Sequence, residues 1–207
     1  MARASLRDIR KQEIIDAAID VIGEVGLSDT TLNMIGKRAG LSAPLMVHYF
    51  EDKSLIIEAS MRTLSAVLGH EFRRRIGPKT GPADRLDAVI DACFSTVNFE
   101  DGRMGAWLAF WLHIPRKPNL KRLHKAIAAR FWSNIRFAFA GLVPKAAIDD
   151  GVQGLSALID GFWWRIAIDP ESVDLAQAKR ICRSFVTTYV ASHAPTRGGG
   201  RPRIPPL

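Results

Sequence analysis

The sequence has few cysteines, no long apolar run and no apolar N-terminal segment. Its two cysteines, Cys93 and Cys182, lack the spacing of a zinc site, and we expect both to be ordinary reduced thiols. The longest apolar run, residues 106–112, is far shorter than the roughly eighteen residues that a membrane span needs. The first residues, MARASLRDIRKQ, lack the apolar region of a secretion signal. We therefore expect a cytoplasmic protein with no membrane partner.

Patterns that carry catalysis are also missing. The sequence has no glycine-rich loop of the kind that cradles phosphate groups. His113 and His124 have no third ligand nearby, so no metal site is expected. Neither cysteine has a histidine or aspartate at a spacing that would make it a nucleophile. We therefore expect that the chain is not an enzyme and uses no cofactor.

The composition is that of a globular protein, with 47% apolar and 24% charged residues in a chain of 207. The net charge of +8 suggests nucleic acid, but residues 1–53 hold seven Lys and Arg against eight Asp and Glu. Bulk charge is thus weak evidence for DNA binding. Its placement says more, because four basic residues and a single acid, Asp8, lie within Arg3–Lys11, here called the basic arm.

Apolar residues recur at helical spacing through most of the chain, and no segment alternates as a half-buried strand does. The fold is therefore predicted to be all-α. Glycine and proline pairs place a domain boundary at 76–82. The predicted units are an N-terminal domain at 1–53, a linker helix at 52–75, a C-terminal domain at 76–193 and a disordered tail at 194–207. The expected helices are 6–25, 30–39, 43–48, 52–75, 83–98, 103–114, 118–140, 146–168 and 172–193.

Residues 31–53, TLNMIGKRAGLSAPLMVHYFEDK, carry the most informative motif. Two short helices joined by the tight turn Ala39-Gly40-Leu41 form a helix-turn-helix. Ser42 is expected to cap the second helix, and Pro44 sits in its first turn, where a missing N–H is tolerated. Such a helix presents its N-terminal residues to base edges in the major groove of DNA.

This segment resembles the TetR family of transcriptional regulators. The matching features are a threonine at the start of the second helix, the Ala-Gly-Leu-Ser turn, and the aromatic pair followed by Lys53. The resemblance implies an N-terminal DNA-binding domain followed by a C-terminal ligand-binding and dimerisation domain. It implies that Thr31, Tyr49 and Lys53 hold backbone phosphates, and that the basic arm reaches an adjacent groove. It places these residues against the bases: Ser42, Ala43, Pro44, Leu45 and His48.

Two positions qualify this assignment. The family often has tyrosine where Val47 stands, and valine cannot donate to a phosphate, so His48 and Tyr49 carry more of that role here. Phe50 is expected to pack in the core of the three-helix domain.

Two further segments, GAWLAFW at 105–111 and ALIDGFWWR at 157–165, resemble the choline-responsive branch of the TetR family. This resemblance implies a homodimer on a palindromic DNA operator, and an effector that is choline or a related small cation. The regulated genes would be those of glycine betaine synthesis, released from repression by the effector.

The aromatic residues of these segments share helical faces. Trp107, Phe110 and Trp111 have the spacing i, i+3, i+4, as do Asp160, Trp163 and Trp164. Aromatic rings and a carboxylate suit a quaternary ammonium ion, which binds through cation–π contacts. The same tryptophans can instead fill a core or a dimer seam, which is the commoner role of buried aromatics. Asp160, in an apolar run, needs a distant partner, because Arg165 lies about 140° further round the helix.

Two other functions stay open at this point. A regulator of a multidrug efflux pump that senses lipophilic cations would use the same aromatic and acidic residues. A helical interaction module that does not bind DNA would explain the near-neutral charge of residues 1–53 and the valine at position 47.

Overall fold

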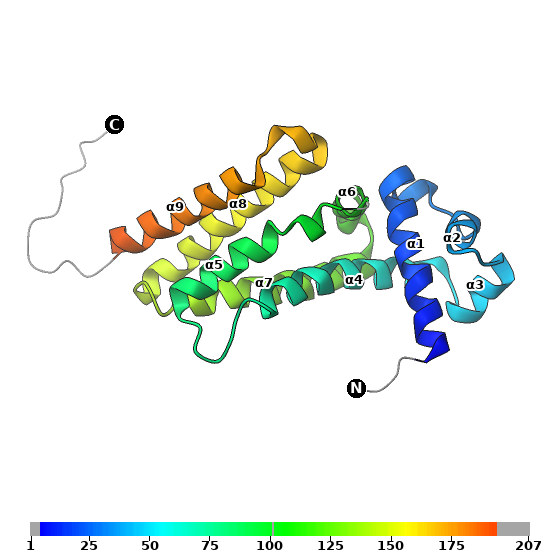
Figure 1. The fold of residues 1–207 in the computed structure, drawn as a ribbon, viewed down its shortest axis with the longest axis horizontal. Helices are drawn as coiled ribbons and strands as arrows, with labels where there is room; N and C mark the ends of the chain where they lie inside the picture. The colour runs from blue at the N-terminus through cyan, green and yellow to red at the C-terminus, as the bar shows by residue number, and fades with distance from the viewer. Residues whose placement is uncertain (1–4, 101, 194–207) are drawn as a thin grey trace, which may run out of the picture.

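The computed structural model describes residues 5–100 and 102–193, and among these the regular structure is helical with no strand. The all-α prediction is confirmed (Figure 1). The helices are α1 (Leu6–Asp29), α2 (Leu32–Ala39), α3 (Ala43–Tyr49), α4 (Lys53–Arg73), α5 (Pro82–Cys93), α6 (Arg103–His113), α7 (Pro118–Phe139), α8 (Ile148–Ile168) and α9 (Leu175–His193). The tail at 194–207, the first residues of the basic arm and the side chain of Ala43 lie outside the described part. Within that part, no helix combines the length and apolarity needed to cross a bilayer.

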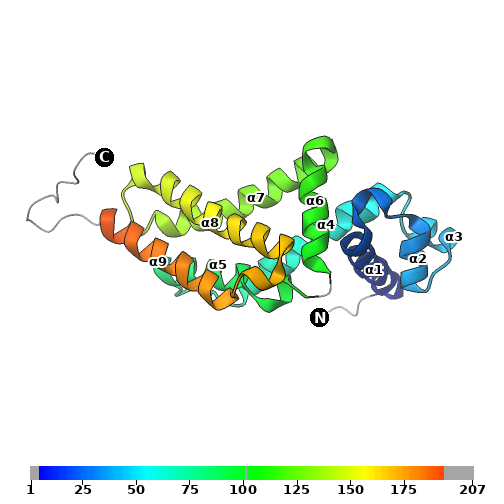
Figure 2. The same cartoon turned by 90° about the horizontal axis from the view of Figure 1, so that it is seen from above.

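Helices α1, α2 and α3 gather at one end of the molecule around a small apolar core (Figures 1 and 2). Ile14 from α1, Ile35 from α2 and Met46 from α3 are fully buried there, together with Ile56 from the start of α4. Helices α5 to α9 form the larger unit, in which α8 and α9 lie side by side (Figure 2). The small unit is therefore a three-helix domain that α4 completes.

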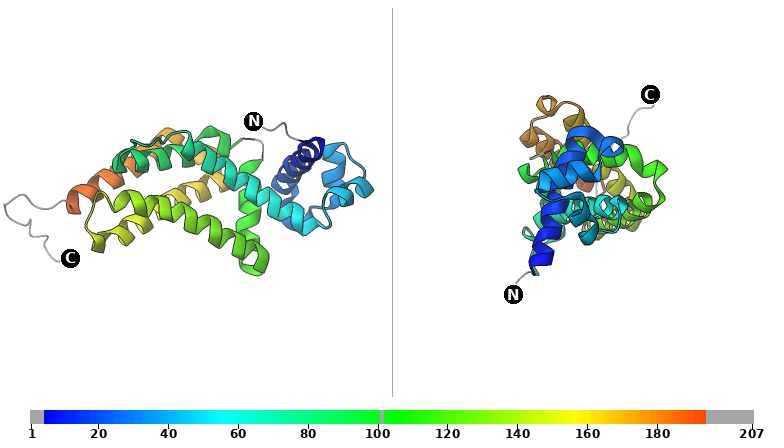
Figure 3. Two further views of the ribbon diagram at one scale, coloured as in Figure 1. Left: turned by 90° about the horizontal axis from the view of Figure 1, so that it is seen from below. Right: turned by 90° about the vertical axis from the view of Figure 1, so that its right-hand side faces the viewer.

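The two units share helices. Residues Ile19 and Ile22 on the other face of α1 belong to the large core, as do Met61 and Leu64 further along α4. Figure 3 shows α4 leaving the small domain and running into the larger one. A displacement inside the large unit therefore reaches the small domain through α1 and α4.

The contact between α1 and α6 depends on glycine. A Cβ atom on Gly23 would lie 2.4 Å from the carbonyl oxygen of Gly102, and one on Gly105 would lie 2.6 Å from the carbonyl oxygen of Gly23. Both separations are far below van der Waals contact. The two backbones therefore touch directly, with no side chain between them.

Three helix boundaries differ from the prediction by three residues or more. The helix expected to end at 98 ends at Cys93, because the Asn98 side chain donates to the Ala92 carbonyl oxygen at 2.8 Å and the Trp163 indole donates to that of Cys93 at 3.1 Å. The helix expected to start at 172 starts at Leu175. The helix expected to end at 25 continues to 29, across a glycine at position 26 that has left helical geometry with φ 79°.

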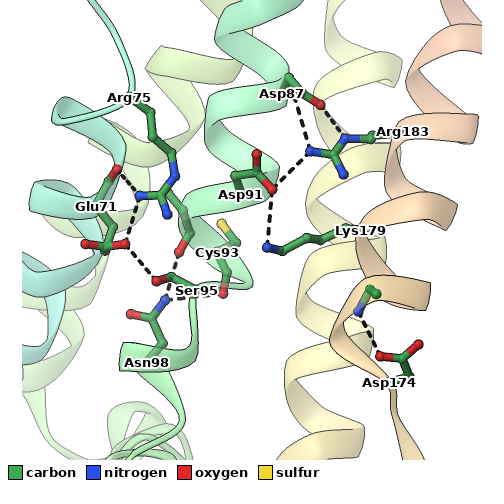
Figure 4. A network of polar contacts seen from close by, with 12 residues as sticks. Glu71, Arg75, Asp87, Asp91, Cys93, Ser95, Asn98, Asp174, Lys179 and Arg183 are labelled. Atoms are coloured by element: carbon green, nitrogen blue, oxygen red, sulfur yellow. Dashed lines mark hydrogen bonds and ion pairs between the residues drawn. The ribbon is translucent and has the colours of Figure 1, made fainter.

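A polar network ties α4 to the segment after α5 (Figure 4). The buried carboxylate of Glu71 accepts hydrogen bonds from Arg74 at 2.7 Å, from Arg75 at 2.8 Å and from the Ser95 hydroxyl at 2.7 Å. These donors, Arg74 first, outweigh desolvation and lower the pKa of Glu71 from 4.5 to about 2. Glu71 is therefore ionised and its charge is compensated locally.

Candidate functional site

The helix-turn-helix is formed as expected from the turn residues. Gly40 ends α2 in the left-handed conformation, with φ 66°, and its N–H donates to the end of that helix. Gly36 lets the turn close, since a Cβ atom there would lie 2.8 Å from the Leu41 carbonyl oxygen. The sequence analysis missed Gly36, although it lies one helical turn before Gly40 and could have been found by that spacing.

Helix α3 presents an open face. Leu45 is 39% exposed and His48 is exposed, whereas Met46 between them is fully buried. Ser42 occupies the N-cap position, but its hydroxyl makes no capping hydrogen bond, contrary to expectation. The reason is local, since one of the two N–H groups that a cap accepts from belongs to Pro44, which has none. The Ser42 hydroxyl at the tip of α3 is therefore free to bind a partner.

The three residues predicted to contact phosphates differ in their local contacts. Thr31 is exposed and caps α2, its hydroxyl accepting from the Met34 N–H at 3.2 Å. Tyr49 is half-buried against the small core and meets the His48 ring edge-on, with 5.4 Å between centroids. The ammonium of Lys53 donates to the Leu27 carbonyl oxygen of α1 at 3.4 Å.

The described part of the basic arm borders the end of α3. Arg7 and Lys11 line a cavity of about 410 Å³ with His48 and Tyr49, and Arg62 of α4 lies on the same cavity. Lys11 sits over the ring of Phe50 at 5.6 Å from its centroid. Phe50 packs against the small core, as expected. Glu51 and Glu58 line the same cavity, so its charge is mixed. Arg62 was missed, because nothing in its local sequence relates it to α3.

Helices α6 and α8 bring four tryptophans together. Trp107 stacks on Trp111 with 6.1 Å between ring centroids, and Trp111 contacts Trp164 at the same distance. Trp163 contacts Trp107 at 6.1 Å and Trp111 at 6.3 Å. The spacing argument therefore identified side chains that meet in space.

Burial divides this cluster into two parts. Phe110, Trp107 and Trp163 are buried, at 0%, 7% and 5% exposure, and belong to the large core. Trp111 is half-buried and Trp164 is 43% exposed. The core-packing alternative thus describes the inner three residues, whereas the outer pair is accessible to solvent.

Asp160 lies one helical turn before Trp164 on α8. It is exposed, so it does not need the distant partner that the sequence analysis expected. Neighbouring protein atoms still desolvate the carboxyl group and raise its pKa, while nearby His124 of α7 acts in the opposite direction. An acidic group therefore stands beside the exposed tryptophan.

Comparisons with known proteins agree with this architecture. Residues 14–60 match the family "Bacterial regulatory proteins, tetR family", and residues 82–191 match "BetI-type transcriptional repressor, C-terminal". The HTH-type transcriptional regulator BetI of Proteus mirabilis (strain HI4320) is 37% identical over 188 residues, covering 90% of this chain and 94% of that protein. The HTH-type transcriptional regulator BetI of Escherichia coli (strain K12) is 34% identical over 192 residues, covering 92% of this chain and 98% of that protein.

Solved structures share the fold at lower identity. A transcriptional regulator from Pseudomonas aeruginosa PAO1 superposes with a TM-score of 0.73 at 23% identity, covering 88% of this chain and 91% of the other. A transcriptional regulator from Saccharomonospora viridis, solved in complex with choline, superposes with a TM-score of 0.75 at 17% identity, covering 86% of this chain and 95% of the other. The resemblance seen in the sequence and the expectation that the chain is not an enzyme are thus confirmed. The chain belongs to the TetR family of DNA-binding transcriptional repressors, in the group that carries a BetI-type C-terminal domain.

Proposed function

We propose that this repressor binds a palindromic operator as a homodimer and releases the genes of glycine betaine synthesis when choline or a related quaternary ammonium binds. The observation that carries the proposal is the identity of 37% to a BetI regulator over nine-tenths of the chain. As the operator of such genes is chromosomal, the proposed site of action is the cytoplasm.

The DNA contacts follow from the open face of α3. Ser42 has an unused hydroxyl, and Leu45 and His48 stand on the exposed side. We assign the base contacts to Ser42, Ala43, Pro44, Leu45 and His48. Thr31, Tyr49 and Lys53 are assigned to phosphates, and Arg7 and Lys11 add positive charge beside Tyr49.

The dimer is supported by apolar side chains that α8 and α9 leave exposed. Ile168 and Ile181 are 65% and 38% exposed. Pairing of two copies through this surface, here called the α8–α9 face, would cover them. A symmetric dimer then places two α3 helices in successive major grooves, about 34–36 Å apart.

The proposed effector site is the outer part of the tryptophan cluster. Trp111 and Trp164 supply ring faces and Asp160 supplies the negative charge that a quaternary ammonium requires, each cation–π contact contributing about 0.5–2 kcal/mol. The choline complex of a regulator with the same fold supports this class of ligand. Trp107, Phe110 and Trp163 would hold the outer pair in place from behind.

The test is fluorescence anisotropy of a labelled DNA duplex from the promoter region of the glycine betaine synthesis genes. The duplex is titrated first with the protein and then with choline. Choline should release the duplex, and Trp164→Ala should raise the required choline concentration about tenfold. Trp132→Ala on α7 is the matched control, because Trp132 is also 43% exposed but lies outside the cluster. Choline that leaves the complex intact would overturn the effector assignment.

The same titration separates the alternatives. Release by tetraphenylphosphonium without release by choline would identify a sensor of lipophilic cations. Failure to bind the duplex even at low salt would leave the choline-gene operator unsupported.

A further inference from the structure

The positive charge of the chain is concentrated outside the small domain. The formal net charge of the whole chain is +8, and residues 102–148 alone hold nine lysines and arginines with no aspartate or glutamate. Residues 1–53, in contrast, hold seven bases and eight acids. Binding to the DNA backbone draws its affinity from Lys and Arg side chains that neutralise phosphates. The small domain has no surplus of such side chains, whereas the C-terminal domain has one.

Five of these basic residues lie on one exposed surface at the start of α7. Lys117, Lys121 and Lys125 follow one another at a spacing of four, which places their side chains on the same side of the helix. Arg116 and Arg122 are the sequence neighbours of this row. The whole set is exposed, and we call it the α7 basic face: Arg116, Lys117, Lys121, Arg122 and Lys125.

The charge of this face is not compensated within the part of the chain that the structure describes. No carboxylate there forms an ion pair with any of its five residues. Arg122 donates a hydrogen bond to the Asn119 side-chain oxygen at 3.0 Å, but that oxygen belongs to a neutral amide. Helix α7 itself contains no aspartate or glutamate. The five like charges repel one another, and a polyanion bound to them would relieve that repulsion.

The α7 basic face begins beside the small domain. Helix α7 starts at the end of the large unit nearest to the small domain and runs away from it (Figures 2 and 3). Lys117, at the start of α7, and Lys53, at the start of α4, line one cavity of about 560 Å³ together with Asn119 and Ser54. Glu58 is the acid that lines it. Two lysines from different domains therefore face the same space.

The two ammonium groups are close enough to influence each other. Burial lowers the pKa of Lys53, and the charge of Lys117 lowers it further, while Asp29 acts in the opposite direction. An anion placed near both lysines would offset their repulsion. Lys53 is assigned above to a DNA phosphate, so the DNA backbone is the anion that this position favours.

We propose that the α7 basic face is a second DNA-binding surface, through which the C-terminal domain contacts the sugar–phosphate backbone beside each operator half-site. Lys117 contacts the phosphate next to the one assigned to Lys53, and Lys121 contacts the phosphate beyond it. The other three residues of the face raise the local positive potential. The position of the face beside DNA rests on the proposed contact of Lys53, but it is independent of which genes the operator controls.

These contacts add affinity and no sequence preference, because phosphates are alike at every base step. Recognition of bases thus stays with α3, while a large part of the electrostatic attraction comes from the other domain. An anionic lipid surface matches the face less well. Leu120 and Leu123, which lie between its charged residues, are buried and cannot insert into a bilayer.

The salt dependence of binding to a labelled duplex of unrelated sequence tests the proposal, measured by fluorescence anisotropy of the full chain between about 50 and 200 mM salt. The double variant Lys117→Ala/Lys121→Ala loses two phosphate contacts. The slope of the logarithm of the binding constant against the logarithm of salt concentration should therefore become shallower by about two. Affinity at about 50 mM salt should fall at least about tenfold.

Two further double variants separate a phosphate contact from other effects. Lys145→Ala/Arg180→Ala removes the same charge from exposed positions outside the face and should leave the slope unchanged. Lys117→Arg/Lys121→Arg should keep the slope of the unaltered chain, because arginine also binds phosphate.

Ethylation interference on the promoter duplex locates the contacts. Ethylation of a phosphate should weaken binding of the unaltered chain, but not of the variant that lacks the lysine contacting that phosphate. The phosphate identified by Lys117→Ala should adjoin the one identified by Lys53→Ala.

The proposal is overturned if Lys117→Ala/Lys121→Ala has the slope of the unaltered chain, or if the chain does not bind the unrelated duplex at about 50 mM salt. An unchanged slope together with weaker binding to phosphatidylglycerol vesicles would likewise overturn it and assign the face to a lipid surface. The assignment of the operator fails separately. A chain that releases no promoter duplex with choline, but loses slope in Lys117→Ala/Lys121→Ala, leaves this second DNA-binding surface intact.

Discussion

The Nζ atom of Lys53 lies 3.4 Å from the backbone carbonyl oxygen of Leu27 and donates a hydrogen bond to it. This bond joins the first residue of α4 to the last turns of α1. Partial burial lowers the pKa of Lys53, and the positive charge of Lys117 lowers it further. A DNA phosphate that recruits Lys53 must therefore draw its ammonium away from this carbonyl oxygen.

Lys53→Ala is expected to weaken binding to specific and non-specific duplexes alike. The slope of the logarithm of the binding constant against the logarithm of salt concentration should become shallower by about one, because one phosphate contact is lost. Anisotropy between about 50 and 200 mM salt measures the slope. Lys145→Ala, in the turn before α8, should leave it unchanged. Equal slopes for Lys53→Ala and the unaltered chain would show that Lys53 contacts no phosphate and only joins α4 to α1.

Gly105→Ala should separate α1 from α6. The added Cβ atom meets the Gly23 carbonyl oxygen at 2.6 Å, and the overpacking should lower the free energy of unfolding by about 1–3 kcal/mol. Operator affinity should fall as well, because α1 carries the small domain. Urea unfolding and anisotropy measure the two effects. The control is Gly77→Ala, where the Cβ atom meets nothing within 4 Å.

Glu71→Gln should change how stability depends on pH. The pKa of Glu71 is about 2 in the folded chain, below its ordinary value of 4.5, so its ionised form stabilises the fold above pH 4.5. That contribution is lost as the pH falls from 4.5 toward 2. The variant should therefore melt at a lower temperature than the unaltered chain near neutral pH. Its melting temperature should fall less on acidification.

Thermal melts between about pH 7 and pH 3 test this prediction. Glu171→Gln is the control, since Glu171 is exposed beyond the end of α8. Parallel pH profiles for Glu71→Gln and the unaltered chain would contradict the role given to the network of Arg74, Arg75 and Ser95.

Ile168→Asp should disrupt the proposed dimer. Ile168 is 65% exposed in the single chain, so the substitution should not disturb the fold of the protomer itself. Light scattering should show a shift to monomer mass, and operator affinity should fall at least about tenfold because one half-site is lost. Leu112→Asp is the control, since Leu112 is 58% exposed on α6, outside the α8–α9 face. A monomeric unaltered chain would contradict the proposal directly.

The helix-turn-helix was predictable because its signals are local. Gly40 and Pro44 act on their own turns of the chain, and the structure places α2 and α3 where these residues indicate. The end of α5 was not predictable, because the groups that bind its last carbonyl oxygens come from Asn98 and from Trp163, the latter 70 residues away. Helical spacing could identify side chains that share a face, but not how much of each face is covered.

The same limit applies to the candidate effector site. The spacing of Trp111 and Trp164 on their helices was visible, whereas the exposure of Asp160 depends on how α7 packs.

The direct approach of the backbones at Gly23 and Gly105 has a mechanical consequence. Side chains between helices can change rotamer and so absorb a small shift, but two main chains in contact have no such compliance. We therefore expect a movement of α6, which carries Trp107 and Trp111, to shift α1 directly. In the proposed dimer, the spacing of the two α3 helices then depends on the rigidity of this glycine contact.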